Sequence, residues 1–310
     1  MKTRYVLAAA VFVFLFCALF PPLGAAETSQ EEPSVVKIGA WINAIEKVDT
    51  PEQTFTVDFY LWFKYTDVRP DIEFLRGTPT MSLISEEERP TENYLEYRVR
   101  GVYTEPLDFR EFPLDEHFLS VALEDKNNDA SQLVFEPDVE ESGVDPKLEV
   151  AGWDLKDFRL YEVKHDYPGE NYSQFVFGLT IYRSKVSAVF KNFFPIVVIT
   201  LISLLTFAIS IKNFGQRVAI CVTTLMSAVA YHLAALSGLP ALGYLTLFDR
   251  IMLVIYTLFL YNLLVSVQGM RLVEMGKVTI AEKFETRMQN LLIPLTLLLS
   301  FVFIGLFSYI

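Results

Sequence analysis

The stretch GQRVAICVTTLMSAVAYHLAALSGLP, from Gly215 to Pro240, decides how the rest of the sequence is interpreted. It is apolar enough for one helix to cross a bilayer, which takes about 20 residues. Yet polar groups interrupt the run at Thr223, Thr224, Ser227 and His232. Because lipid offers such groups no hydrogen-bond partners, they must face protein or water.

Six residues of this stretch are spaced three or four apart and define what we call the pore stripe. They are Ala219, Thr223, Met226, Ala230, Leu233 and Ser237. Residues three and four apart lie on one face of an α-helix. A ring of identical helices would form hydroxyl rings and an apolar constriction at Met226 and Leu233, which closes pores by dewetting. The alternative is a bundle helix that uses small residues and Ser/Thr for packing.

Charge divides the chain into two halves. Residues 27–185 hold 34 acidic and 16 basic residues, whereas residues 186–310 hold 4 acidic and 8 basic ones. Four long apolar runs fall in the second half, at about 190–211, 217–237, 249–268 and 288–310. An acidic half followed by an apolar, weakly basic half indicates separate compartments.

The N-terminus has the three parts of a secretory signal peptide. Lys2 and Arg4 precede an apolar run, and small residues follow it up to Ala26. We therefore predict a signal peptide over residues 1–26, with an uncleaved anchor as the alternative.

Residues 27–185 are predicted to form an extracellular β-sandwich. The segment TFTVDFYLWFKY, residues 54–65, alternates in the manner of a half-buried strand. Turn clusters such as EDKNNDAS and HDYPGEN separate further runs of this kind. Many short strands with this spacing favour an immunoglobulin-like sandwich.

Residues 186–310 are predicted to be a four-helix transmembrane pore domain. Basic residues occur between the first and second apolar runs and between the third and fourth, but not between the second and third. The positive-inside rule places the two basic loops in the cytoplasm. The signal peptide independently places the β domain outside, so both signals predict one topology.

The opening stretch resembles the pore-lining second membrane helix of the pentameric ligand-gated ion channels, the Cys-loop receptor family. EPLDFREFPLDEHFL, residues 105–119, resembles the signature loop of that family, and FKNFFPIVV resembles its first membrane helix with Pro195. SGLPALGYLTLFD resembles the linker between the second and third helices, and Trp153 matches a family position. Glu105 and Leu119 replace the two cysteines that close the loop in animal receptors, as in bacterial members.

The resemblance covers residue 35 to the end and implies a β + α membrane protein. Each subunit of a homopentamer would add a sandwich of about ten strands and four helices. A small-molecule agonist would bind between sandwiches, and the second helices would line a pore for monovalent cations. A bacterial source implies the cell inner membrane, with the N-terminal domain in the periplasm.

One departure concerns ion selectivity. Gln216 stands where cation channels of the family carry a ring of Glu, and the Pro-Ala signature of anion channels is absent before it. The acidic outer domain would concentrate cations at the vestibule. We therefore expect cation conduction, with the pore lining beginning at Gln216.

The resemblance also implies a ligand site of aromatic residues between subunits, where ring faces attract an ammonium. The positions carried over are Glu124, Tyr161, Tyr167 and Tyr172 on one side, and Trp62, Lys64, Arg98 and Arg100 on the neighbour's side. Glu124 beside tyrosines indicates an amine as the ligand, whereas Lys64, Arg98 and Arg100 would equally suit a carboxylate ligand. Each tyrosine can alternatively be an ordinary strand residue.

Coupling between the two domains is expected at the base of the sandwich. By resemblance, Asp49 and Asp115 lie near Arg183, where carboxylates can share charge-assisted hydrogen bonds with the guanidinium. Pro240 of the linker would press against them. A surface ion pair of little energetic weight is the alternative.

Other classes of function fit less well. No zinc signature, nucleophile elbow or phosphate loop indicates an enzyme, a metal site or a cofactor, and nothing indicates a nucleic-acid partner. A non-conducting membrane sensor of the same fold is an alternative. A proton-gated channel is a second alternative, because the chain has three histidines, His117, His165 and His232.

Overall fold

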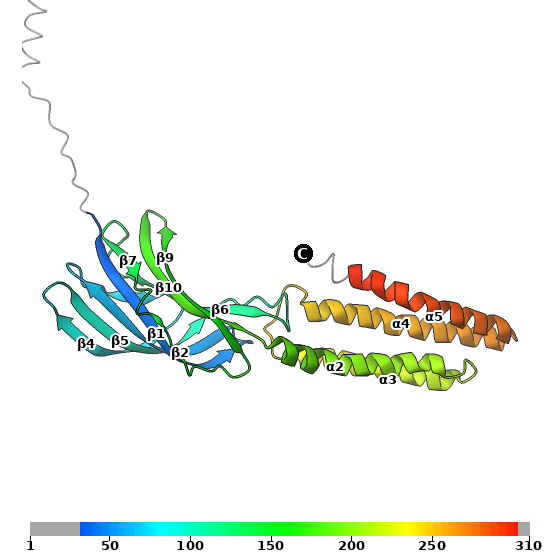
Figure 1. Ribbon diagram of the computed structural model, residues 1–310. Helices are drawn as coiled ribbons and strands as arrows, with labels where there is room; N and C mark the ends of the chain where they lie inside the picture. Colours follow the sequence, from blue (N-terminus) through cyan, green and yellow to red (C-terminus); the bar gives the residue numbers. More distant parts are fainter. Residues whose placement is uncertain (1–31, 303–310) are drawn as a thin grey trace, which may run out of the picture.

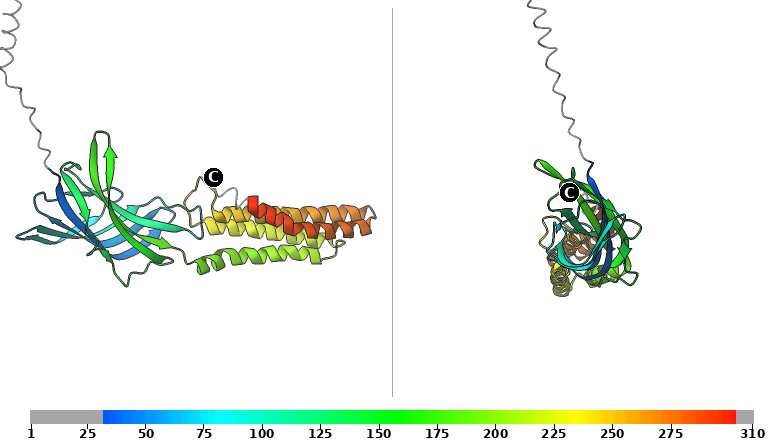
Figure 2. Two further views of the ribbon diagram at one scale, coloured as in Figure 1. Left: turned by 45° about the horizontal axis from the view of Figure 1, so that its top comes forward. Right: turned by 90° about the vertical axis from the view of Figure 1, so that its left-hand side faces the viewer.

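A computed structural model describes residues 32–302, which form a β domain followed by a bundle of long helices (Figure 1). The two parts lie end to end, so that the molecule is elongated along the helix axes (Figure 2). The predicted signal peptide, residues 1–26, lies outside the described residues.

The described part of the β domain contains ten strands in two sheets. They are β1 (Ser34–Asp49), β2 (Thr54–Tyr65), β3 (Ile72–Phe74), β4 (Thr80–Glu88), β5 (Asn93–Thr104), β6 (Glu116–Asp125), β7 (Leu133–Pro137), β8 (Gly143–Val144), β9 (Asp154–Tyr167) and β10 (Glu170–Tyr182). One sheet has the order β4-β5-β2-β1-β7, with β8 also paired to β1. The other has the order β3-β6-β10-β9. The predicted β-sandwich is confirmed.

The core lies between the sheets and follows the alternation in the sequence. Every second residue of β2, from Phe55 to Tyr65, is buried. Phe59 packs edge-on against Phe177 of β10 in the facing sheet, with ring centroids 4.9 Å apart. Aromatic pairs of this geometry add to the apolar burial that holds the sheets together.

The helices are α2 (Lys185–Leu204), extended by the 3₁₀ turn η1 (Leu205–Ala208), then α3 (Phe214–Leu236), α4 (Leu247–Glu274) and α5 (Val278–Ser300). Eleven residues of α4 are buried, against four of α3 and one of α5. The helix α4 therefore provides most of the core of the bundle, and it packs against both α3 and α5.

The connection between α4 and α5 differs from the sequence-based expectation. The apolar runs predict a loop over residues 269–287. In the structure, α4 continues to Glu274 and α5 begins at Val278, ten residues before the predicted start of the fourth helix. The segment VTIAEKFETRMQN contains good helix formers, so α5 begins there. Because many of these residues are polar, a hydropathy profile does not detect this part of the helix. Only Met275, Gly276 and Lys277 turn the chain, with Gly276 at φ 74°.

Three helices among the described residues are long and apolar enough to cross a membrane, namely Lys185–Ala208, Phe214–Leu236 and Leu247–Glu274. Charged residues occupy the first turns of α5, and residues 303–310 lie outside the described part. The fourth predicted span, residues 288–310, therefore stays a prediction.

Candidate functional site

The face of α3 that carries the predicted pore stripe points away from its own bundle. All seven predicted residues, from Gln216 to Ser237, are exposed in the single chain. Met226 and Leu233 are 69% and 68% exposed. The opposite face is buried through Arg217, Cys221, Thr224 and Ala228. The helix therefore has one face packed within its own bundle and one that a single chain leaves uncovered.

The polar groups of α3 find partners in two ways. Thr224 and Ser227 donate their hydroxyls to backbone carbonyls one turn earlier, at 2.8 and 2.9 Å. His232 instead faces α4, where its Nε2 lies 2.8 Å from Asp249 Oδ1 and its Nδ1 lies 2.9 Å from the Tyr256 hydroxyl. The imidazole thus ties two helices together and lies outside the exposed stripe.

A buried ion pair joins the β domain to the first helix. Arg183, two residues before α2, donates from Nε to Asp115 Oδ1 at 2.9 Å, and the Asp115 side chain is fully buried. The guanidinium also lies 4.2 Å from the ring centroid of Trp153. His117 donates from Nε2 to the other Asp115 oxygen at 2.6 Å. The sequence-based pairing of Asp115 with Arg183 is present, and it is not a surface contact.

The environment of Asp115 favours its charged form. Burial alone disfavours a carboxylate, but the hydrogen bond from His117 and the positive charge of Arg183 outweigh it, so the pKa of Asp115 lies below its usual value. The pair is therefore ionised at neutral pH, and the link between the domains is charge-assisted.

The expected contact of Asp49 with Arg183 is not present. Among residues 32–302, no ion pair joins these two side chains; Asp49 contacts Lys47 Nζ at 2.5 Å instead. The neighbouring Thr50 donates to the carbonyl of Gly238 at 2.7 Å. The loop after β1 thus contacts the linker two residues before Pro240 through a hydroxyl rather than through a carboxylate.

The signature loop docks on the start of α4. The amides of Leu247 and Phe248 donate to the carbonyls of Arg110 and Phe112, at 2.7 and 3.1 Å. Phe248 is fully buried, and its ring contacts those of Phe112, Phe193, Tyr231 and His232. One side chain thereby connects the β domain to α2, α3 and α4. Sequence reasoning missed Phe248, because a Phe in an apolar run gives no local signal of this role.

Glu124 forms the centre of a second polar cluster, beneath the β9–β10 hairpin. Its carboxylate is buried and lies 2.5 Å from His165 Nδ1, 2.8 Å from Gln174 Nε2 and 3.3 Å from the Tyr167 hydroxyl. Burial and the charge of Glu124 raise the pKa of Tyr167. Tyr172 packs edge-on against Tyr167, with centroids 5.6 Å apart. Three of the four residues predicted on this side of the site therefore lie together.

A cavity of about 550 Å³ lies beside this cluster. Tyr161, the fourth predicted residue, lines it together with His165, Tyr167 and Gln174. Such a volume suits a small organic molecule. Sequence reasoning did not assign His165 or Gln174 to the site. Two strand pairings bring them there: β10 pairs with β6, where Phe175 lies opposite Leu123, and with β9, where Tyr172 lies opposite His165.

Trp62 and Lys64 have partners within their own chain. The Trp62 indole donates to Asp138 at 3.3 Å, and Lys64 Nζ lies 2.8 Å from both Asp138 and Glu141. Asp138 is fully buried. These contacts hold the two side chains in place, so their predicted contact with a ligand bound to a neighbouring subunit stays a prediction.

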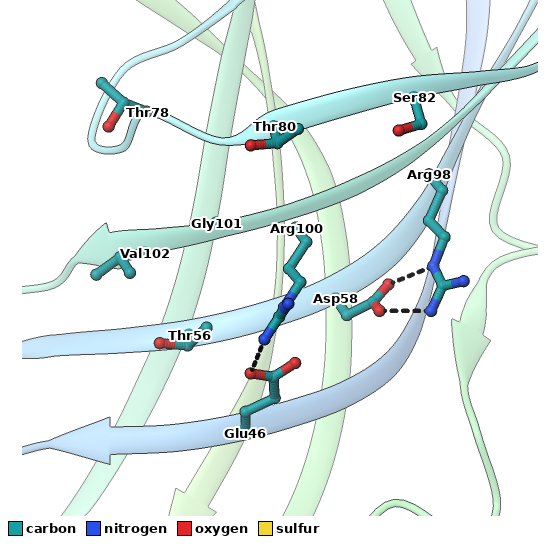
Figure 3. A pocket seen from close by; sticks show the side chains of 10 residues that line it. All are labelled: Glu46, Thr56, Asp58, Thr78, Thr80, Ser82, Arg98, Arg100, Gly101 and Val102. Carbon is teal, nitrogen blue, oxygen red and sulfur yellow. Dashed lines mark hydrogen bonds and ion pairs between the residues drawn. The ribbon is translucent and has the colours of Figure 1, made fainter.

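Arg98 and Arg100 lie on the other sheet from Glu124 and line a groove of about 850 Å³ (Figure 3). Arg98 makes a two-point ion pair with Asp58, at 3.1 and 2.7 Å, and Arg100 contacts Glu46 at 2.7 Å. Both guanidinium groups are therefore matched by carboxylates. The structure separates them from the Glu124 cluster within one chain.

The structure thus combines a β-sandwich, fastened at its base to apolar helices, with one helix face that a single chain leaves uncovered. No family model matches the chain. A curated relative is the proton-gated ion channel of Gloeobacter violaceus, which is 25% identical over 309 residues, covering 89% of this chain and 85% of the relative. This similarity confirms the resemblance to the bacterial pentameric ligand-gated ion channels and supports a channel rather than an enzyme.

Proposed function

We propose that the chain is the subunit of a homopentameric, cation-conducting channel opened by a small molecule. Residues 27–185 form the periplasmic ligand-binding part, and residues 186–310 form the pore in the cell inner membrane. The observation that carries this proposal is the two-faced helix α3, whose exposed stripe begins with polar and small residues and then carries the bulky apolar Met226 and Leu233. Five such faces around one axis form a water-filled path with an apolar gate.

The agonist class that fits best is a small amine. Tyr161 and Tyr167 line the cavity, and the buried Glu124 carboxylate accepts a hydrogen bond from the Tyr167 hydroxyl. Ring faces and a carboxylate both attract an ammonium group. The two arginines that would suit a carboxylate ligand are already paired with Asp58 and Glu46.

Two-electrode recording in oocytes tests this proposal with a panel of amines and carboxylates at constant pH. We expect an amine to evoke current, and Glu124→Gln to raise its half-maximal concentration about tenfold to a hundredfold, the effect of one lost charge-assisted hydrogen bond. Asp154→Asn, at an exposed position at the far end of β9, is the control. Current from carboxylates alone contradicts the amine site, and surface-expressed protein without any current supports a non-conducting sensor.

Protons are the second candidate agonist, because the relative is described as proton-gated. The contact of His165 with Glu124 gives this chain a titratable pair at the same cavity. Steps from pH 8 to pH 5 without added amine distinguish the two candidates. Acid-evoked current that His165→Gln abolishes favours protons, whereas current that needs an amine at every pH favours the small molecule.

A further inference from the structure

Arg217 is a charged residue inside the helical bundle. It follows Gln216 at the start of α3, yet it is only 1% exposed. Its Nη2 lies 2.5 Å from Glu285 Oε1 of α5, and its Nε donates to the carbonyl of Ile209 at 2.9 Å. Among the residues that the structure describes, Glu285 is the one carboxylate in ion-pair contact with Arg217.

The position of this pair matters because of its neighbour. Gln216 is exposed on the pore stripe and carries no charge, whereas Arg217 points to the opposite face of α3. A charge within a membrane helix is costly unless it is paired, and such residues usually serve function. Glu285 both cancels the charge of Arg217 and holds the guanidinium on the side of α3 that faces the bundle.

We propose that Glu285 determines ion selectivity, although it lies on α5 and away from the pore stripe. By pairing with Arg217, it keeps five guanidinium charges away from the inner mouth of the pore. Without the carboxylate, each guanidinium would keep only its hydrogen bonds to the Ile209 carbonyl and would have no counter-charge in the bundle, which favours its movement toward water beside Gln216. Five positive charges there would repel cations and attract anions. This inference rests on the proposed pentameric pore.

The test is the reversal potential of open channels under a NaCl gradient, with surface protein measured by biotinylation. Glu285→Gln should lower the ratio of Na⁺ to Cl⁻ permeability about tenfold, the effect of a few unit charges near a narrow water-filled path. The double variant Arg217→Gln with Glu285→Gln removes both charges and should restore the original ratio. Glu282→Gln, an exposed carboxylate on the same helix, should leave the ratio unchanged.

Glu285→Asp is the second variant, for use if Glu285→Gln does not fold. It keeps the carboxylate but shortens the side chain by one methylene, so we expect a smaller decrease in the ratio of Na⁺ to Cl⁻ permeability. A ratio equal to that of the original channel in either single variant, at normal surface amount, overturns the role of Glu285. Absence of current from every variant, including the unmodified chain, overturns the proposed channel and this inference together, so the two failures are distinguishable.

Discussion

Arg183 is the residue whose removal separates coupling from folding most clearly. Its guanidinium joins the fully buried Asp115 to the start of α2 and stacks on Trp153. Arg183→Ala leaves that carboxylate with His117 alone, at a cost of about 3 kcal/mol in stability. We expect agonist binding to persist while evoked current is lost, measured by radioligand binding and by recording on the same membranes.

Arg183→Lys is the control for this prediction, because it keeps the charge but loses the planar contact with Trp153. It should retain part of the current. Full current from Arg183→Ala would show that the ion pair does not transmit gating. Loss of binding together with current would indicate a purely structural role.

Asp115 also predicts a pH dependence of stability. Its pKa lies below its usual value of 3.8 in the folded chain, so its ionised form stabilises the fold at all pH values above about 4. That contribution is lost as the pH falls through the lower pKa of the folded state. Because Asn does not titrate, Asp115→Asn should be less stable than the original protein at pH 6, and the difference should shrink at pH 3.

Thermal unfolding in detergent between pH 3 and pH 7 measures this difference. Asp108→Asn, at an exposed position of the same loop, is the matched control and should show little effect. A stability difference of equal size at pH 6 and pH 3 would mean that Asp115 acts through its shape rather than its charge.

The helix α3 is the element on which the channel depends. Met226 and Leu233 face away from the bundle, and in the proposed pentamer they form the closed constriction. Met226→Ser replaces a side chain whose burial is worth about 1.5–3 kcal/mol. It should therefore raise resting current at least about tenfold. Ala228→Ser, on the buried face, should not, and equal resting currents would place the gate elsewhere.

Element positions could be predicted wherever the pattern of the sequence is local. The alternation of β2 and the apolar runs of α2, α3 and α4 predicted these elements, because period and length depend on nearby residues alone. The polar start of α5 could not be recognised in the same way. A hydropathy profile scores charge, whereas helix formation there depends on propensity and on packing against α4.

Side-chain partners were harder to predict than elements. Asp115 and Arg183 came from a resemblance, and their contact is present, whereas Asp49 contacts Lys47 instead. Lys64 contacts Asp138, 74 residues away, because β1 pairs with β2, which carries Lys64, and with β7, which ends one residue before Asp138. Such contacts depend on sheet pairing, which a single sequence does not display.

At the scale of the whole molecule, the proposed channel requires five copies of α3 around one axis. That arrangement is needed for the proposed roles of three features: the acidic β domain, the uncovered face of α3 and the paired Arg217. In a single chain, the residues of the stripe are exposed. In the proposed pentamer, this face of α3 therefore borders water when the channel is open.

Cysteine accessibility measures whether this face borders water. In a Cys221→Ser background, Leu233→Cys and Ala228→Cys place a thiol on the exposed and on the buried face of the same helix. A charged thiol reagent is applied during agonist-evoked current. The proposed pore predicts rapid, irreversible block of Leu233→Cys and no effect on Ala228→Cys. Block of Ala228→Cys with an unaffected Leu233→Cys would contradict it, because the buried face would then be the one that borders the ion path.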